Sequence, residues 1–231
     1  MYTLFACWQV LGVWSRVEDE LLAAADATGR LSRQVSVDST TARAHIHAAG
    51  ARRDSFGRVA GEPDHHALGR SRGGWGTKTH AAIDQQRGVL SFTLTPGQDG
   101  DSPQLVPVLD GIRVTRPNGG RPRRRPERVL ADKACSSRAN RAWLARHHIQ
   151  ATIPVPADQA ANRARRGSHG GRPPAFDPET YKTVMPSIAA STTSYTTVDS
   201  PPDRTSSPSA TPPPSTSPAS TTGSGDSRNR S

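Results

Sequence analysis

The spacing of hydrophobic residues changes along the chain, and each spacing predicts a different kind of element. Near the N-terminus, Trp14, Val17, Leu21 and Ala25 recur at helical spacing, and Gly29 follows where a helix would end. Charged residues fill the positions between them. We therefore expect an amphipathic helix whose apolar side packs against a partner.

Short apolar or alternating runs predict five strands. The first should be buried and end on Asp38, and the polar, glycine-punctuated stretch over 42–72 predicts a long loop. The second and third flank the turn sequence QQRG and should form a hairpin. The predicted strands are residues 34–40, 74–84, 89–97, 127–134 and 149–156.

Two further helices are predicted among these strands. One begins with Asp101 or Ser102 as its N-cap, and the other spans residues 136–148. The apolar positions of the first are Leu105, Val108 and Leu109. Those along the second are Ala139, Ala142, Trp143 and Ala145 or Arg146. Three early strands followed by alternating helix and strand indicate an α/β fold, with a mixed sheet and helices packed on it.

Composition changes the picture at both ends. From about residue 183 the chain is mostly Ser, Thr and Pro, which bury too little surface to offset the entropy of ordering, so we expect a disordered tail. The first fourteen residues are apolar, but they are too few to span a bilayer and lack the basic start of a signal peptide. The expected regions are a helical remnant over 1–30, a core over 31–182 and a tail over 183–231.

The charge of the chain points to an anionic partner. Its net charge of +10 and pI of about 10.8 attract polyanions, of which nucleic acid is the commonest, although a GC-rich genome would also make arginine frequent. The basic run over 119–127 fits an arginine arm in the DNA minor groove or a solvated loop, and 161–174 is a second basic loop. Candidate DNA contacts are Arg70, Arg72, Lys78, Arg121, Arg123, Arg124, Arg125, Lys133, Arg165 and Arg166.

Two carboxylates stand out in this basic chain. Asp38 and Asp132 each follow a short apolar run and should lie at the ends of two strands. Neighbouring carboxylates repel unless cations lie between them, and paired Mg²⁺ ions held by such acids support phosphodiester chemistry. The alternative is that each acid is an ordinary turn or cap residue.

Other candidate groups carry weaker signals. His45 and His47 could form a metal site, but no nearby ligand completes it, so contact with DNA or solvent is favoured. His80 should be a packed, hydrogen-bonded core residue, and Asp84 should stabilise a turn. No Ser-His-acid arrangement supports a nucleophilic Ser39. Trp75 and Trp143 are expected in the core. The two cysteines give no disulfide framework, which favours a cytoplasmic location.

Four blocks of the sequence resemble one family, the bacterial insertion-sequence transposases with a DDE catalytic domain. In chain order they are VSVDSTTARAHIHAAG, GRSRGGWGTKTHAAID, LTPGQDGDSPQLVPVLDGI and VLADKACSSRANRAWL. The resemblance implies an RNase H-like fold and DNA strand cleavage and transfer at element ends. It also implies two Mg²⁺ (or Mn²⁺) ions held by Asp, Asp and Glu, with Asp38 and Asp132 as the first two acids. The implied partners are double-stranded DNA, the terminal repeats of the element, and a second copy or an intact transposase, with no membrane.

The third acid of that family is missing from its expected place. In the family a Glu follows a Tyr-Lys pair, but here no Glu follows Tyr181 and Lys182, and the last one is Glu179. We expect a frame slip near residue 183, an incomplete fold truncated at both ends, and a catalytically defective copy. The alternative is a non-catalytic DNA-binding remnant that inhibits an intact transposase. A nuclease of the same fold is a third reading.

Overall fold

The computed structural model describes residues 2–45, 67–116 and 119–182. The predicted disordered tail over 183–231 therefore lies outside the described residues. Among the described helices, none is long and apolar enough to cross a lipid bilayer.

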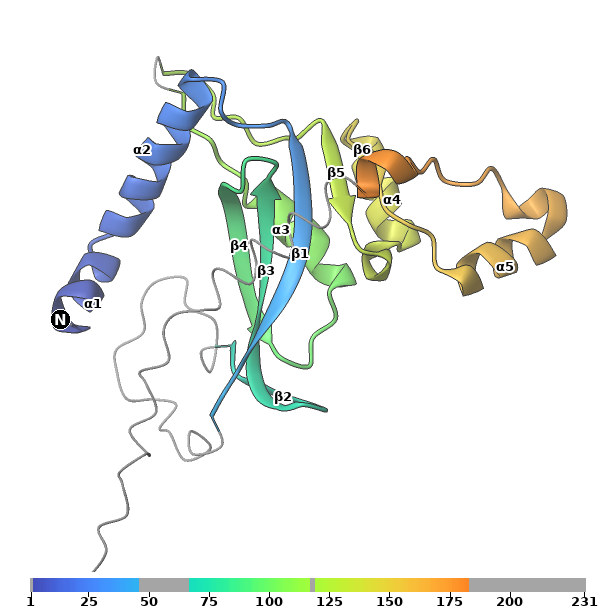
Figure 1. Ribbon diagram of the computed structural model, residues 1–231, viewed down its shortest axis with the longest axis horizontal. Coiled ribbons are helices and arrows are strands. Elements are labelled where there is room, and N and C mark those ends of the chain that lie inside the picture. Colours follow the sequence, from blue (N-terminus) through green and yellow to red (C-terminus); the bar gives the residue numbers. More distant parts are fainter. Residues whose placement is uncertain (1, 46–66, 117–118, 183–231) are drawn as a thin grey trace, which may run out of the picture. The chain divides into compact units, whose positions relative to one another are not determined.

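A mixed sheet forms the centre of the described chain (Figure 1). β1 pairs antiparallel with β3, which also pairs antiparallel with β4 and β2, whereas β5 and β6 continue the sheet parallel to β1. The strands are β1 (Gln34–Arg43), β2 (Gly69–Ser71), β3 (Gly74–Asp84), β4 (Val89–Pro96), β5 (Arg128–Ala131) and β6 (Gln150–Thr152). This antiparallel meander with two parallel strands added beside β1 confirms the predicted RNase H-like mixed sheet with flanking helices.

The prediction for the first strand was wrong at its end. β1 does not stop at Asp38 but continues to Arg43, because β3 is long enough to pair with it as far as Gly76. The predicted loop over 42–72 correspondingly loses its first two residues to β1 and Gly69–Ser71 to β2, while 46–66 lie outside the described residues. The polarity of these two segments could not predict that they are strands, because each is a strand only through its pairing with β3.

The predicted hairpin of β3 and β4 is confirmed, and Asp84 explains its turn. Asp84 is buried, and its carboxylate accepts hydrogen bonds from the backbone N–H groups of Ser32, Gln86 and Gly88 at 3.1, 3.0 and 2.6 Å. A carboxylate with three backbone donors holds the turn closed and ties it to the chain before β1. The structural role predicted for Asp84 agrees with these contacts.

The helices are short and lie around this sheet. Those before the sheet are α1 (Tyr2–Val10) and α2 (Val13–Ala27). Those that follow β4 are η3 (Ser102–Gln104), α3 (Leu105–Asp110), η4 (Lys133–Cys135), α4 (Arg138–Arg146), α5 (Ala157–Arg165) and η5 (Gly167–Gly170). The loop predicted over 161–174 was wrong as far as residue 170, because α5 and η5 occupy that part of it.

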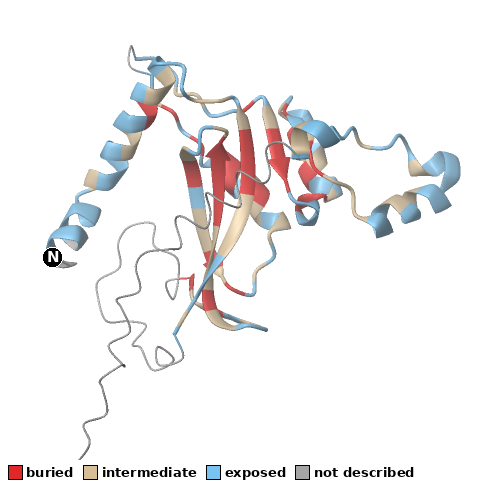
Figure 2. Cartoon of the chain, viewed as in Figure 1, coloured by how far each residue is buried: buried red, intermediate tan, exposed pale blue. Residues whose placement is uncertain are grey.

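One face of the sheet carries the main hydrophobic core (Figure 2). Alternate residues such as Val35, Val37 and Val129 point to this face, and α3 and α4 pack over it. The apolar face predicted for α3 is confirmed, since its three residues are at most 2% exposed. For α4 the predicted line of alanines was wrong: Asn140 and Leu144 are the buried positions, while Ser137 caps the helix through its hydroxyl.

The apolar side predicted for α2 is not the side that is buried. Trp14, Val17 and Leu21 are 40%, 45% and 66% exposed, and Leu22 and Ala23 are buried instead. Trp14 packs against the side chains of Phe5 and Trp8 of α1, with ring centroids 5.3 and 5.4 Å apart. Helical spacing predicted the helix correctly, but which face meets the sheet depends on contacts outside the helix.

Candidate active site

Parallel pairing of β1 with β5 brings the two predicted acids together. Val37 pairs with Ala131; Asp38 is the next residue of β1, and Asp132 directly follows the end of β5. Both acids line one cleft of about 210 Å³. The cleft is also lined by Ser39, His80, Asp101 and Cys135. Two acids that are 94 positions apart in sequence therefore share one site because their strands are neighbours.

Asp38 lies partly buried within β1 rather than at its end. Burial raises the pKa of its carboxyl, and the nearby charges of Asp132 and Asp101 raise it further. The backbone N–H of Ser39 donates to Oδ1 at 2.8 Å and offsets part of this pKa rise. The ionised form is thus disfavoured by its surroundings, which is the electrostatic situation that a bound cation would relieve.

Asp132 is exposed and serves as the N-cap of η4. Its Oδ1 accepts a hydrogen bond from the backbone N–H of Lys133 at 2.6 Å. The alternative prediction, that this acid caps a turn, is therefore realised. A carboxylate has two oxygens with about four acceptor positions, so capping leaves Asp132 able to bind a further group.

Asp101 is a third carboxylate of the cleft, and it is the N-cap residue of η3, one of the two residues predicted for that position. It precedes η3, but its side chain makes no capping hydrogen bond. Its Oδ1 accepts hydrogen bonds from the Ser39 hydroxyl at 2.9 Å and from Lys78 Nζ at 3.1 Å. Pro103 in the first turn marks the start of the helix in the sequence. The contacts of Asp101 with Ser39 of β1 and Lys78 of β3 depend on how distant segments pack, so the sequence near Asp101 could not predict them.

His80 and Cys135 are uncharged groups that line the same cleft. His80 is 2% exposed, and its Nε2 lies 2.9 Å from the Thr95 hydroxyl, as expected of a packed, hydrogen-bonded residue. Burial lowers the pKa of His80 more than the carboxylate of Asp101, 3.7 Å from Nδ1, raises it. For Cys135, burial and the three carboxylates raise the thiol pKa to about 11. Both groups are therefore neutral near pH 7.

The last described residues lie close to the acids. Residues 178–182 are helical, and Arg128 of β5 holds this turn through Asp177 and Thr180, at 3.5 and 3.3 Å. Burial raises the pKa of the Tyr181 phenol, and the charges of Asp132 and Asp38 raise it further. Tyr181 is therefore near enough to both acids for their charges to act on it, whereas Lys182 pairs with Glu179.

The donor set fits a hydrated divalent cation only in part. Asp38 and Asp132 offer the hard carboxylate oxygens that Mg²⁺ prefers, and Mg²⁺ keeps several waters when few protein ligands are present. Asp101 is already bound to Lys78 and Ser39. Across residues 2–45, 67–116 and 119–182, no group of three or more His, Cys, Asp or Glu side chains has the arrangement of a metal site. Two carboxylates are therefore available where the family resemblance implies three.

The predicted DNA contacts fall into two classes. Lys78 is only 16% exposed and pairs with Asp101, and Arg123 pairs with Asp26 at 2.7 Å, so these two cations have protein partners. Arg165 is exposed and hydrogen-bonds to Asn162. The other exposed candidates are Arg70, Arg72, Arg121, Arg124, Arg125, Lys133 and Arg166.

The remaining predicted groups lie as follows. His45 is exposed, and His47 lies outside the described residues. Trp143 is partly buried against the core and stacks on His147 with centroids 4.0 Å apart, in agreement with a packing role. Trp75 of β3 is half-buried.

Comparison with solved structures finds transposases. The Mos1 transposase paired-end complex with left transposon end is 16% identical, with a TM-score of 0.30, over 76% of this chain and 53% of that one. The catalytic domain of Mos1 mariner transposase is 15% identical, with a TM-score of 0.29, over 76% and 78%. The Mos1 mariner paired end complex with Mn is 18% identical, with a TM-score of 0.30, over 76% and 53%. The chain thus spans about half the length of the full transposases among them.

Comparison with protein families gives a direct assignment. No curated protein matches the chain. The family described as the transposase DDE domain matches residues 29–216, which is most of the 231 residues and includes both acids of the cleft. The chain belongs to the transposase DDE domain family.

Proposed function

We propose that this chain is a DNA transposase of the bacterial insertion-sequence kind, whose chemistry is DNA strand cleavage and transfer at the ends of an element. The observation that carries this proposal is the cleft shared by Asp38 of β1 and Asp132, which directly follows the parallel strand β5. Membership of the DDE family supports it. The proposed partners are double-stranded DNA with the terminal repeats and a second copy of a transposase, in the cytoplasm.

Asp38 and Asp132 are the residues proposed to hold the metal. When bound, Mg²⁺ or Mn²⁺, two ions in an intact relative, would activate the attacking water or 3′ hydroxyl and stabilise the leaving oxygen. The protein contributes by fixing the carboxylates: the Ser39 and Lys133 backbone N–H groups each hold one oxygen of an acid. Lys78 binds the carboxylate of Asp101. Because His80 is neutral, it adds no positive charge that would repel a metal ion in the cleft.

The missing third acid makes this copy a defective enzyme in our proposal. Two carboxylates hold a divalent ion more weakly than three, and the sequence contains no Glu after Glu179. A frame slip near residue 183 accounts for the change to Ser, Thr and Pro. Translating the other frames of the encoding DNA tests this, and absence of a Glu-bearing helix in all of them would exclude a slip.

A second candidate function, DNA binding without cleavage, is favoured because the described residues offer only two carboxylates to a metal ion and no group of three or more ligands. A chain that binds DNA without cleaving it could occupy the terminal repeats or the dimer interface of an intact transposase. A steep salt dependence with preference for the terminal repeats would support such a specific remnant. Weak binding that is uniform across sequences would reflect charge alone.

The experiment is metal-dependent cleavage of a DNA that carries the terminal repeats, measured with Mg²⁺ and with Mn²⁺. Asp132→Asn is the control, because it keeps the cap acceptor but removes the charge. Cleavage that the control abolishes would support an active transposase and overturn the proposed defect. DNA binding without cleavage would support the second candidate.

A further inference from the structure

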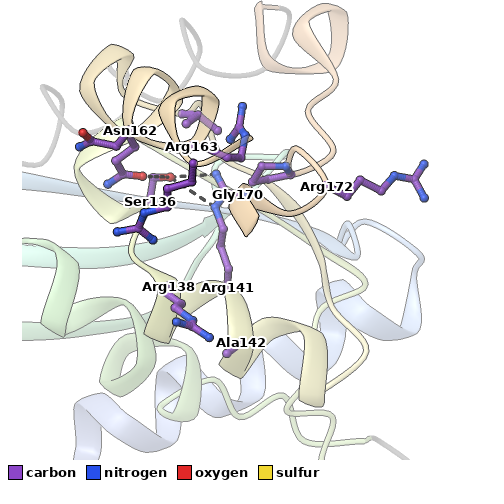
Figure 3. A pocket seen from close by; sticks show the side chains of 12 residues that line it. Ser136, Arg138, Arg141, Ala142, Asn162, Arg163, Gly170 and Arg172 are labelled. Carbon is purple, nitrogen blue, oxygen red and sulfur yellow. Dashed lines mark hydrogen bonds between the residues drawn. The ribbon is translucent and has the colours of Figure 1, made fainter. Parts of the chain in front are cut away.

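A separate cavity of about 570 Å³ lies between α4 and the segment that contains α5 and η5 (Figure 3). Five arginines line it, and none of the described residues in its wall is acidic. They are Arg138 and Arg141 from α4, Arg163 from α5, Arg166 and Arg172. The cavity is far larger than one phosphate group needs and has the size of a site for a substantial ligand.

The arginines differ in whether their guanidinium groups already bind other groups of the protein. Arg141 donates to the Ser136 hydroxyl at 2.9 Å and to the Ile153 carbonyl at 2.8 Å, which makes it part of the wall. Arg138, Arg163 and Arg166 form no ion pair with any acid in the part of the chain that the structure describes. Arg172 extends away from the others in Figure 3. Three cations therefore face a cavity whose described wall offers no counter-charge.

The polar and apolar groups in the wall match a nucleotide rather than a simple anion. Guanidinium groups form paired hydrogen bonds with phosphate oxygens and are the preferred side chains for phosphate. Gln159 and Asn162 add amide donors, and Val155 and Pro174 add an apolar surface of the kind that a sugar can contact.

The cavity adjoins the carboxylate cleft through one short segment. Cys135 lines the cleft, and the next residue, Ser136, lines the cavity. Consecutive Cα atoms are about 3.8 Å apart, so the two sites share a wall at the end of η4. A DNA strand that placed one phosphate at the acids would have neighbouring phosphates within reach of the arginines, since its charges repeat at short intervals.

We propose that the arginine cavity binds backbone phosphates of the DNA strand that enters the carboxylate cleft, an inference that rests on the proposed function. Arg138, Arg163 and Arg166 contact the phosphates, and Arg141 holds the wall through Ser136. The cavity positions the strand, and the acids act on it. This assigns strand positioning to α4 and α5 rather than to the basic run over 119–127.

The test measures DNA binding in EDTA, so it does not depend on cleavage. The probe is a fluorescent duplex that carries the terminal repeat, titrated with the full chain at several salt concentrations and followed by anisotropy. The test variant is Arg138→Gln with Arg166→Gln. The matched control is Arg146→Gln with Arg113→Gln, which removes the same charge from exposed arginines outside the cavity, one of them also on α4. Circular dichroism verifies that each variant is folded.

We expect the cavity variant to bind DNA about 10- to 100-fold more weakly, and the control to change binding by less than about threefold. The slope of log affinity against log salt should fall by about 2 in the cavity variant, because two phosphate contacts are lost. Equal effects of both variants would overturn the cavity inference and leave the proposed function standing. Failure of the unaltered chain to bind DNA would overturn both. Binding of inorganic phosphate that the cavity variant loses while DNA binding is unchanged would overturn the DNA assignment.

Discussion

The carboxylate cleft and the arginine cavity adjoin where η4 ends, at Cys135 and Ser136, and have opposite charge. Three carboxylates share the cleft, with Lys78 as an ion-pair partner of one of them, and five arginines share the cavity. Gathering like charges costs folding free energy, because each group is partly desolvated and repelled by its neighbours. In our proposal, one short segment thus separates a site for metal ions from a site for DNA phosphates.

The largest expected effect concerns the reactivity of the two cysteines. With a thiol pKa of about 11, about one Cys135 side chain in a thousand is a thiolate at pH 8, whereas Cys7 is exposed. We expect iodoacetamide to label Cys7 at pH 8 and to leave Cys135 largely unlabelled, as read by peptide mass spectrometry. Rapid labelling of Cys135 in the folded chain would contradict the burial and the negative surroundings that raise its pKa.

The same thiol reports metal binding without any need for cleavage. A cation bound by Asp38 and Asp132 would cancel part of the charge that raises the Cys135 pKa, so millimolar Mg²⁺ should speed its labelling at pH 9–10. Asp132→Asn should speed it in EDTA and remove the response to Mg²⁺. An identical response to Mg²⁺ in Asp132→Asn would show that this acid holds no metal.

The next largest effect concerns Asn140, which joins α4 to η3 and η4. It is 5% exposed, and its Nδ2 donates to the carbonyls of Ser102 and Cys135 at 2.8 and 3.1 Å. Asn140→Ala should lower the free energy of unfolding by about 2–3 kcal/mol, because buried carbonyls lose their donors. Urea denaturation measures this, with Ala139→Ser as the exposed neighbouring control. A loss no larger than that of the control would show that α4 does not hold η4 in place.

A smaller effect is expected for the pairing of Asp101 with Lys78. Asp101→Asn keeps an acceptor for the Ser39 hydroxyl but leaves the 16% exposed Lys78 ammonium without its charged partner. Stability should fall by about 1–2 kcal/mol, and Lys78→Met combined with Asp101→Asn should recover part of it. If the double variant loses the sum of the two single effects, the residues are not coupled.

The smallest effect is a gain in stability from Asp38→Asn. The folded-state pKa of Asp38 is raised above its unfolded value, so the folded protein loses stability as the pH rises from the usual aspartate pKa through the folded one. The asparagine variant avoids this loss, so its melting temperature should exceed that of the unaltered chain at pH 7. The two should converge as the pH falls below the usual aspartate pKa. Lower stability of the variant at pH 7 would contradict this sign.

The sequence predicted most of the helices and strands because hydrophobic spacing and turn residues act over a few neighbouring positions. Alternation over 74–84 predicted β3 to the residue, and the apolar face of α3 was also predicted. The two catalytic candidates were recognisable from short motifs, since each acid follows an apolar run and matches a family block. The sequence by itself also determined that no Glu follows Tyr181.

Tertiary structure alone decided which residues meet. The register of β1 against β3 and β5 extends β1 beyond Asp38 and places Asp132 beside it. The approach of these strands also gives the side chain of Asp101, the N-cap residue of η3, Ser39 and Lys78 as partners in place of a capping hydrogen bond. The packing of α2 and α4 selects Leu22, Asn140 and Leu144 as buried positions where periodicity pointed to others. Strand pairing and helix packing join residues far apart in sequence, and neither composition nor local spacing contains the register that sets their contacts.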